Sequence, residues 1–309
     1  MRRALLTGFL LACARTAAPL PVVPAGAEAV SLRGEPLARP SLSDEVRAER
    51  QRALDAARAA HDKDPADVDA TIWLARRLGY LHRYREAVSV LTEGMARHPR
   101  DARLYRHRGH RYLTLRLFPH AVADLEHGVA LRAGQPDEIE PDGLPNAAGI
   151  PTSTLHGNLW YHLALARYLM GDLTGAADGW REAMRIATTD DTRVAVAHWW
   201  YVTLRRLGRH DEAARVVAAL PPAPRILDND AYHLLVRLYR GELDAAELEA
   251  RLASGDDLDR ATLGYGLARW YAQAGDAARA EAKLQAILDG GGWPAFGYLA
   301  AEADRARGR

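Results

Sequence analysis

The sequence predicts an all-α fold built from repeated pairs of helices, and three observations support this. The segment 74–99 aligns without a gap to the segment 108–133, which is a spacing of 34 residues. Small residues recur at one position of each copy, as Ala87 and Ala121 do, and large apolar residues recur beside them, as Leu91 and Leu125 do. A fixed period of about 20–50 residues is typical of stacked units, because one unit cannot bury its apolar face alone.

The chain begins with MRRALLTGFLLACAR, which has a basic start, a short apolar run over residues 4–12 and the single cysteine, Cys13. This run is shorter than the ~20 residues that a membrane-spanning helix needs, and it is typical of an export signal. The tetrapeptide LLAC resembles the lipobox of bacterial lipoproteins. The resemblance implies that residues 1–12 are a signal peptide, that cleavage occurs before Cys13 and that Cys13 is acylated. The alternative is a plain signal peptide that is cleaved later, after Ala27.

Residues 13–42 are rich in alanine and proline and show no periodicity, as expected for a flexible tether. Position 14 is alanine, and by resemblance to lipoproteins of bacteria with two membranes this favours the outer membrane. We therefore expect a lipid-anchored protein that faces the periplasm. The alternative is a soluble periplasmic or secreted protein.

Single helices are predicted at both ends of the repeat region. The first begins after Ser43, a plausible N-cap with Glu45 and Glu49 near the positive end of the helix. The last begins at Trp293-Pro294. Both are interpreted as capping elements for the helix pairs between them.

The repeated positions resemble the tetratricopeptide-repeat (TPR) family, whose 34-residue signature has W-x2-L-G-x2-Y, then A-x3-F, then P. The resemblance implies a TPR solenoid from residue 43 to 309, a right-handed α-α superhelix of about six helix-pair repeats with N- and C-terminal capping helices. It is strong for fold and weak for function. The anchor alanines of the six copies are Ala87, Ala121, Ala176, Ala213, Ala246 and Ala280.

One step between anchor alanines, from Ala121 to Ala176, is 55 residues long and therefore contains about 21 extra residues. This insertion covers about residues 134–154 and carries four prolines and four acidic residues. Prolines at this density forbid a helix, and long loops in compact folds are usually functional or disordered. We expect an ordered loop across the concave surface; the alternative is a mobile surface excursion.

In the TPR family the first helix of each pair lines the concave face, and the resemblance places a basic, hydrogen-bonding wall there. This wall is similar to the carboxylate-gripping grooves of some family members, although none of their lysine positions is kept. The alternative interpretation is that the arginines are solvated or pair with the acidic insertion. The candidate partner-binding residues are Arg76, Arg103, Arg106, His110, Asn158 and Tyr161.

Arg108 stands where the repeat pattern prefers leucine, so its charge needs a partner. Candidate partners are Asp124 on the next predicted helix and two residues of the insertion, Glu138 and Glu140. We hypothesise that the insertion docks on the basic wall and blocks or shapes the groove.

Other chemistries receive little support. The net charge of +1 argues against general nucleic-acid binding. His107 and His110 are three residues apart, but nothing completes a metal site around them. No phosphate-binding loop, zinc-protease motif or nucleophile-elbow motif occurs, so no catalytic residue and no cofactor is expected.

The function predicted is a non-enzymatic protein–protein interaction scaffold in the bacterial envelope, which binds an extended or acidic segment of a protein partner in the concave groove. One alternative is a small-ligand or glycan receptor, with the 134–154 insertion closing the pocket. A second alternative is an accessory subunit of an envelope enzyme complex.

Overall fold

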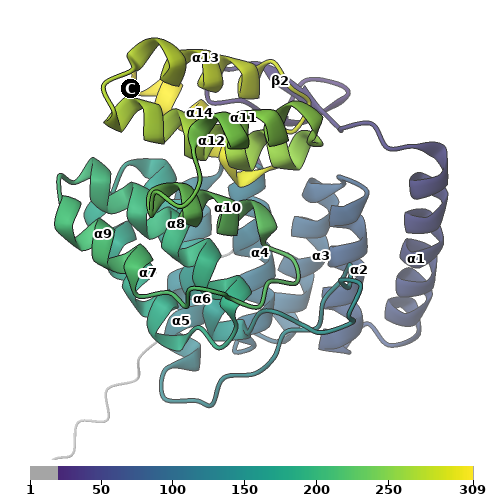
Figure 1. Ribbon diagram of the computed structural model, residues 1–309. Coiled ribbons are helices and arrows are strands. Elements are labelled where there is room, and N and C mark those ends of the chain that lie inside the picture. Colours follow the sequence, from purple (N-terminus) through teal and green to yellow (C-terminus); the bar gives the residue numbers. More distant parts are fainter. Residues whose placement is uncertain (1–19, 309) are drawn as a thin grey trace, which may run out of the picture.

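The computed structural model describes residues 20–308 of the 309-residue chain. Within that range the regular structure is helical apart from one short β-hairpin (Figure 1). A single helix, α1 (Asp44–Lys63), comes first, and a single helix, α14 (Phe296–Ala306), comes last. Between them lie six helix pairs: α2 (Val68–Tyr80) with α3 (Tyr84–Arg97), α4 (Ala102–Thr114) with α5 (Phe118–Arg132), α6 (Leu155–Met170) with α7 (Leu173–Ile186), α8 (Asp190–Arg206) with α9 (His210–Ala218), α10 (Asp230–Tyr239) with α11 (Ala245–Ser254), and α12 (Asp257–Gln273) with α13 (Ala277–Leu288). The predicted all-α array of about six pairs with a helix at each end is confirmed.

The small residues at the repeated positions allow the helices of a pair to approach closely. A Cβ atom added at Gly109 of α4 would lie 2.7 Å from Cγ of Leu125 in α5. Ala87 and Ala121 are both completely buried. The 34-residue period therefore reports a packing requirement, because any larger side chain at these positions would force the two helices apart.

The helices begin where short polar side chains can accept hydrogen bonds from the free N–H groups of the first turn. Ser43 caps α1 by accepting from the backbone N–H of Val46, as the sequence predicts. Thr154, at the end of the insertion, caps α6 by accepting from the N–H of Gly157. This second cap fixes the point at which the insertion rejoins the repeat array.

The C-terminal helices fold back over the array instead of extending it. Helix α14 packs against α12 and α13 and also reaches α6, while α12 contacts α8. Figure 1 shows α11–α14 lying together across one side of the earlier pairs. Phe296 of α14 stands 5.4 Å from the ring of His110 in α4, measured between ring centroids. The closing helix therefore contributes to the same interior surface as the second and third pairs.

The described part of the predicted tether, residues 20–42, is not an unstructured linker. Strands β1 (Ala27–Val30) and β2 (Pro36–Ala38) form an antiparallel hairpin. Its Glu28 carboxylate accepts a 2.7 Å hydrogen bond from the backbone N–H of Arg85, and Trp293 donates its indole N–H to the carbonyl of Ala38 at 2.7 Å. The sequence argument missed this because the contacts reach partners far along the chain, which periodicity does not report. The signal peptide over residues 1–12 and the acylation of Cys13 lie outside the described residues.

No helix in the stretch 20–308 combines the length and the apolar character that crossing a membrane requires.

Candidate functional site

The insertion between α5 and α6 is anchored at its two ends by the backbone. Ile139 and Thr154 form an isolated antiparallel bridge. The N–H of Glu140 donates to the carbonyl of Ser153 at 3.0 Å, and the N–H of Leu155 donates to the carbonyl of Glu138 at 2.9 Å. These bonds close the loop at its base and bring Glu140 beside the start of α6.

Glu140 makes the buried ion pair between the insertion and the basic wall. Its carboxylate lies 2.8 Å from Nη2 of Arg106 and accepts a 3.0 Å hydrogen bond from the side-chain amide of Asn158. The side chains of Arg106 and Glu140 are each only 10% exposed. A buried ion pair of this kind needs additional hydrogen bonds to offset desolvation, and Asn158 supplies one of them.

The backbone that follows Glu140 continues along α2. Arg76 donates to the carbonyl of Pro141 at 2.7 Å, and Arg77 donates to the carbonyl of Gly143 at 3.1 Å. A Cβ atom at position 143 would lie 1.7 Å from the hydroxyl oxygen of Tyr80, so any other residue there would require the Tyr80 side chain to move. Residues 140–143 therefore lie along the wall as an acidic extended segment would, and the hypothesis that the insertion docks on the wall is confirmed by these contacts.

Two other arginines of α4 have partners of their own. Arg103 pairs with Asp69 at 2.5 Å and with Asp101 at 2.6 Å, and its side chain is 36% exposed. Arg108 forms a two-pronged ion pair with Asp124, with distances of 2.7 and 2.8 Å. The partner of Arg108 is thus Asp124, one of the three candidates, while Glu140 pairs with Arg106 instead.

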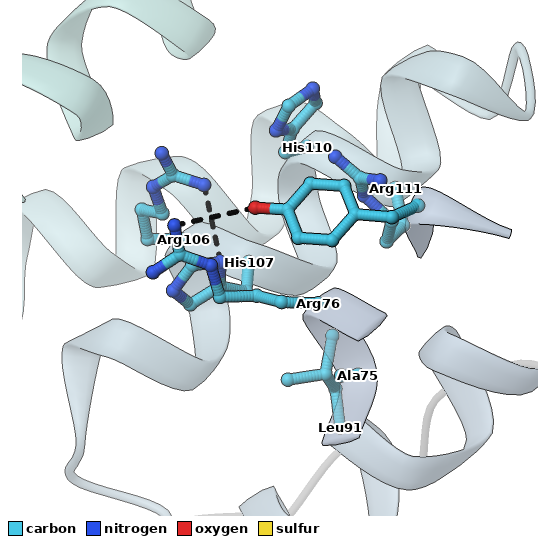
Figure 2. Close-up of a pocket in the computed structure, with 8 residues that line it drawn as sticks. Ala75, Arg76, Leu91, Arg106, His107, His110 and Arg111 are labelled. Carbon is cyan, nitrogen blue, oxygen red and sulfur yellow. Dashed lines mark hydrogen bonds between the residues drawn. The ribbon is translucent and has the colours of Figure 1, made fainter. Parts of the chain in front are cut away.

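A small pocket of about 120 Å³ opens between α2 and α4. Figure 2 shows Arg76, Arg106, His107, His110 and Arg111 gathered around it. Burial, followed by the charge of Arg106, holds the pKa of His107 well below its usual value of 6.5. The basic character of this pocket therefore comes from its three guanidinium groups, with the imidazole of His107 neutral at physiological pH.

A larger pocket of about 450 Å³ lies beside it, and Arg106 and His110 line both. The insertion closes one side through Thr152 and its neighbours, and the C-terminal helices close another through Phe296. The volume is within the range of about 300–1,000 Å³ that small-molecule sites occupy. Its charged and aromatic lining comprises Arg106, Arg251, Asp228, Asp230, Asp259, Tyr161, Tyr232 and Phe296.

Histidines near the pockets are placed for packing. The rings of His110 and His162 stand 4.5 Å apart, between centroids, and both lie against Phe296. Burial holds the pKa of each well below 6.5, with nearby arginines acting in the same direction. Across residues 20–308, no group of three or more His, Cys, Asp or Glu side chains is arranged to hold a metal ion.

The structure brings together most of the residues predicted from the sequence. Four of the six, Arg106, His110, Asn158 and Tyr161, line the larger pocket, and Arg76 joins Arg106 and His110 in the smaller one. Arg103 lines neither pocket.

Sequence reasoning missed Arg77, Arg111 and Tyr80. The 34-residue step from Arg77 to Arg111 was an available signal for the first two. It was missed because that position was not counted among the inward ones.

No protein-family model matches the chain, and no curated protein matches it. Solved structures of similar fold include YrrB, described as a TPR protein with an unusual peptide-binding site, at 16% identity and a TM-score of 0.44 over 77% of this chain and 93% of that one. A tetratricopeptide repeat protein from Parabacteroides merdae ATCC 43184 has 14% identity and a TM-score of 0.49 over 79% of this chain and 87% of that one. MamA has 16% identity and a TM-score of 0.43 over 57% of this chain and 90% of that one. At these values nothing about partner or activity transfers. The chain itself, by the arrangement of its helix pairs, is an all-α helical-repeat solenoid.

Proposed function

We propose that this protein is a non-enzymatic interaction scaffold that binds an acidic, extended segment of a partner protein on the basic wall of its concave face. The observation that carries the proposal is the contact of Glu140 with Arg106 and Asn158. The chain's own insertion occupies the wall as the partner segment would, with a carboxylate on the guanidinium and backbone carbonyls on Arg76 and Arg77.

The partner binds by taking the place of residues 140–143. Guanidinium groups suit this exchange because they hold carboxylates through charge-assisted hydrogen bonds, each worth about 1.5–3 kcal/mol when desolvated. The insertion is tethered, so it competes at an effective concentration of about millimolar. A partner segment must therefore supply a carboxylate and backbone carbonyls as the insertion does, and must also make contacts that the insertion does not make. The larger pocket next to Arg106 has room for these additional contacts.

The test uses a synthetic peptide with the sequence of residues 136–145, PDEIEPDGLP. Glu140→Gln in the protein weakens the docking of the insertion and opens the wall, so the peptide should bind this variant about tenfold more tightly than it binds the wild type. Glu138→Gln is the matched control, since Glu138 lies on the same loop, is 49% exposed and, among residues 20–308, has Arg132 as its one ion-pair partner, at 4.0 Å.

A double variant, Arg106→Met with Glu140→Gln, removes both partners of the buried pair and leaves no unpaired charge behind. It should not bind the peptide. Equal peptide affinity for the wild type, the single variant and the double variant, measured by calorimetry, would show that the wall does not recognise acidic segments. Arg103→Met should leave the affinity unchanged because Arg103 is already held by Asp69 and Asp101.

The proposed location is the bacterial envelope, with a lipid on Cys13 as anchor and the scaffold facing the periplasm at the outer membrane. The support is the sequence LLAC after a basic start and a short apolar run. Incorporation of labelled palmitate by the wild type, with none in Cys13→Ser, is the expected result. Labelling of neither form, with the protein found in the soluble periplasmic fraction, would favour the plain signal peptide.

A small-ligand or glycan receptor is the second candidate, and the pocket of about 450 Å³ favours it. Tyr161, Tyr232 and Phe296 supply aromatic faces, and Asp228 and Asp230 supply hydrogen-bond acceptors. A thermal-shift screen of saccharides against the wild type and Tyr232→Ala distinguishes the candidates. A saccharide that stabilises only the wild type supports the receptor, whereas no hit together with peptide binding supports the scaffold.

A further inference from the structure

The small pocket between α2 and α4 contains more positive charge than its surroundings balance. Arg76, Arg106 and Arg111 all line it, and within the described residues no carboxylate does. Glu140 pairs with Arg106 from the side at 2.8 Å. Arg76 donates to the carbonyl of Pro141, which carries no charge. Two of the three guanidinium charges therefore have no paired carboxylate.

Asp142 is the other acidic group near Arg76, and it balances little of this charge. Burial, followed by the nearby carboxylate of Asp228, raises the pKa of Asp142 against the opposing charge of Arg76. Its carboxylate forms no ion pair with Arg76 within residues 20–308, and one of its oxygens is buried without a hydrogen-bond partner. The pocket thus remains electropositive with the insertion docked.

Arg111 shows that the cluster is built into the fold. In the portion of the chain that the structure covers, its guanidinium makes no ion pair and lies only over the ring of Tyr84, 5.4 Å from the centroid. A Cβ atom at position 79 would lie 2.6 Å from Nη1 of Arg111, so Gly79 leaves the space that the guanidinium occupies. Arg111 is partly buried, and a partly buried guanidinium without a counter-charge is free to bind an anion.

Two further polar atoms at this pocket lack partners. Nε of Arg106 and Nδ1 of His110 are buried and make no hydrogen bond to any residue from 20 to 308. Burial, followed by the positive charge of Arg106 among its neighbours, lowers the pKa of Arg111. Unpartnered hydrogen-bond donors beside uncompensated positive charge indicate that this pocket can bind an anion.

We propose that this pocket binds a doubly charged tetrahedral oxyanion, the chemistry shared by phosphate, sulfate and phosphate monoesters. The two uncompensated guanidinium charges match a dianion better than a single carboxylate. The volume of about 120 Å³ exceeds the about 10–15 Å³ that a cavity needs to hold one water and falls below the about 300 Å³ of drug-sized ligands. Planar guanidinium forks suit such oxyanions because each can donate two parallel hydrogen bonds. The pocket shares Arg76 and Arg106 with the basic wall, but a free ion could fill it with the insertion in place.

The test is calorimetry and thermal unfolding of the purified protein with sodium phosphate, sodium sulfate and O-phosphoserine, against sodium acetate and sodium chloride at matched ionic strength. The proposal predicts one site and a higher Tm with the dianions and no effect beyond screening with acetate or chloride. Binding of O-phosphoserine would assign the site to a monoester, whereas binding of inorganic phosphate and sulfate alone would assign it to the free ion.

Variants locate the site. Arg111→Met should weaken binding of the bound dianion by about tenfold or more and leave the Tm without anion equal to that of the wild type or higher, because an unpaired charge is removed. Arg103→Met, on the same helix but outside the pocket, should bind as the wild type does. Arg76→Met provides a second test at a less buried position should Arg111→Met fail to fold. Equal stabilisation by chloride, or unchanged binding in the Arg111 and Arg76 variants, would overturn the proposal.

Discussion

Arg116, in the turn after α4, binds Glu302 of α14 across 186 positions of sequence, with Nε and Nη2 lying 2.9 and 2.8 Å from the same carboxylate oxygen. The other oxygen of Glu302 accepts a 2.7 Å hydrogen bond from the backbone N–H of Leu32. One buried carboxylate therefore joins the second helix pair, the closing helix and the N-terminal hairpin. This contact makes the structure a closed assembly, in contrast to an open array in which each unit touches only its neighbours.

Glu302→Ala should destabilise the whole protein. Glu302 is only 2% exposed, and its removal leaves the guanidinium of Arg116 buried without a counter-charge, which costs about 3–5 kcal/mol. Urea unfolding monitored by circular dichroism measures the loss. Asp178→Ala is the control, because Asp178 and Arg181 form an exposed pair whose loss should cost about 0–1 kcal/mol. Equal effects of the two substitutions would contradict a closing role for Glu302.

Glu28→Ala should release the N-terminal hairpin while leaving the helix pairs folded. Glu28 is buried, pairs with Arg39 at 2.9 Å and accepts the N–H of Arg85. Its loss leaves that N–H without an acceptor and detaches the hairpin from the first turn of α3. Limited proteolysis should then cut within residues 20–42 much faster than in the wild type. Unchanged cleavage would mean that the hairpin is held mainly by other contacts, such as Trp293 with Ala38.

Stability should fall on acidification, and His198 should account for part of the fall. Burial lowers the pKa of His198 to about 3, while the unfolded chain takes up its proton near 6.5. Between pH 6.5 and 3 the unfolded chain binds a proton at His198 that the folded protein does not bind. The free energy of unfolding therefore decreases as the pH falls from 6.5 towards 3. The slope is at most about 1.4 kcal/mol per pH unit for this one group.

His198→Phe should reduce that slope by one proton, because phenylalanine keeps the aromatic packing against Trp199 and Tyr239 and cannot titrate. Urea unfolding at a series of pH values between 7 and 5 gives the slope for both proteins. The variant also loses the hydrogen bond of Nδ1 with the Tyr239 hydroxyl, so the comparison is between slopes and not between absolute stabilities. Parallel slopes would show that His198 is accessible to protons in the folded state.

The repeat region was predictable because its signal is local. The 34-residue period fixes which small residues face each other, and Gly109 against Leu125 is a contact between neighbouring helices. The pairing of Arg108 with Asp124 could be predicted for the same reason, since a charge at an apolar position of α4 needs a partner on the adjacent α5. The docking of the insertion followed from its acidic composition opposite a basic wall.

The contacts between the C-terminal helices and the earlier helix pairs could not be predicted from the sequence. Nothing in the period indicates that α14 returns to α6, because stacking alone predicts contacts only between neighbours. The hairpin of residues 27–38 was missed because its buried Glu28 and its short strands carry no periodic pattern. Arg103 and Asp69 occupy the same position of successive repeats, 34 residues apart, so their ion pair could have been read from the period, whereas the pair of Arg103 with Asp101 could not.

Hydrogen exchange of the insertion tests directly whether Glu140 holds this segment on the basic wall. The amides of Glu140 and Leu155, which close the base of the loop, should be protected in the wild type and in Glu138→Gln. In Glu140→Gln that protection should fall, and the amides of α4 and of α6 beyond its first turn should keep theirs. Full protection of the insertion in Glu140→Gln, equal to that of the wild type, would show that Glu140 does not hold the insertion on the basic wall.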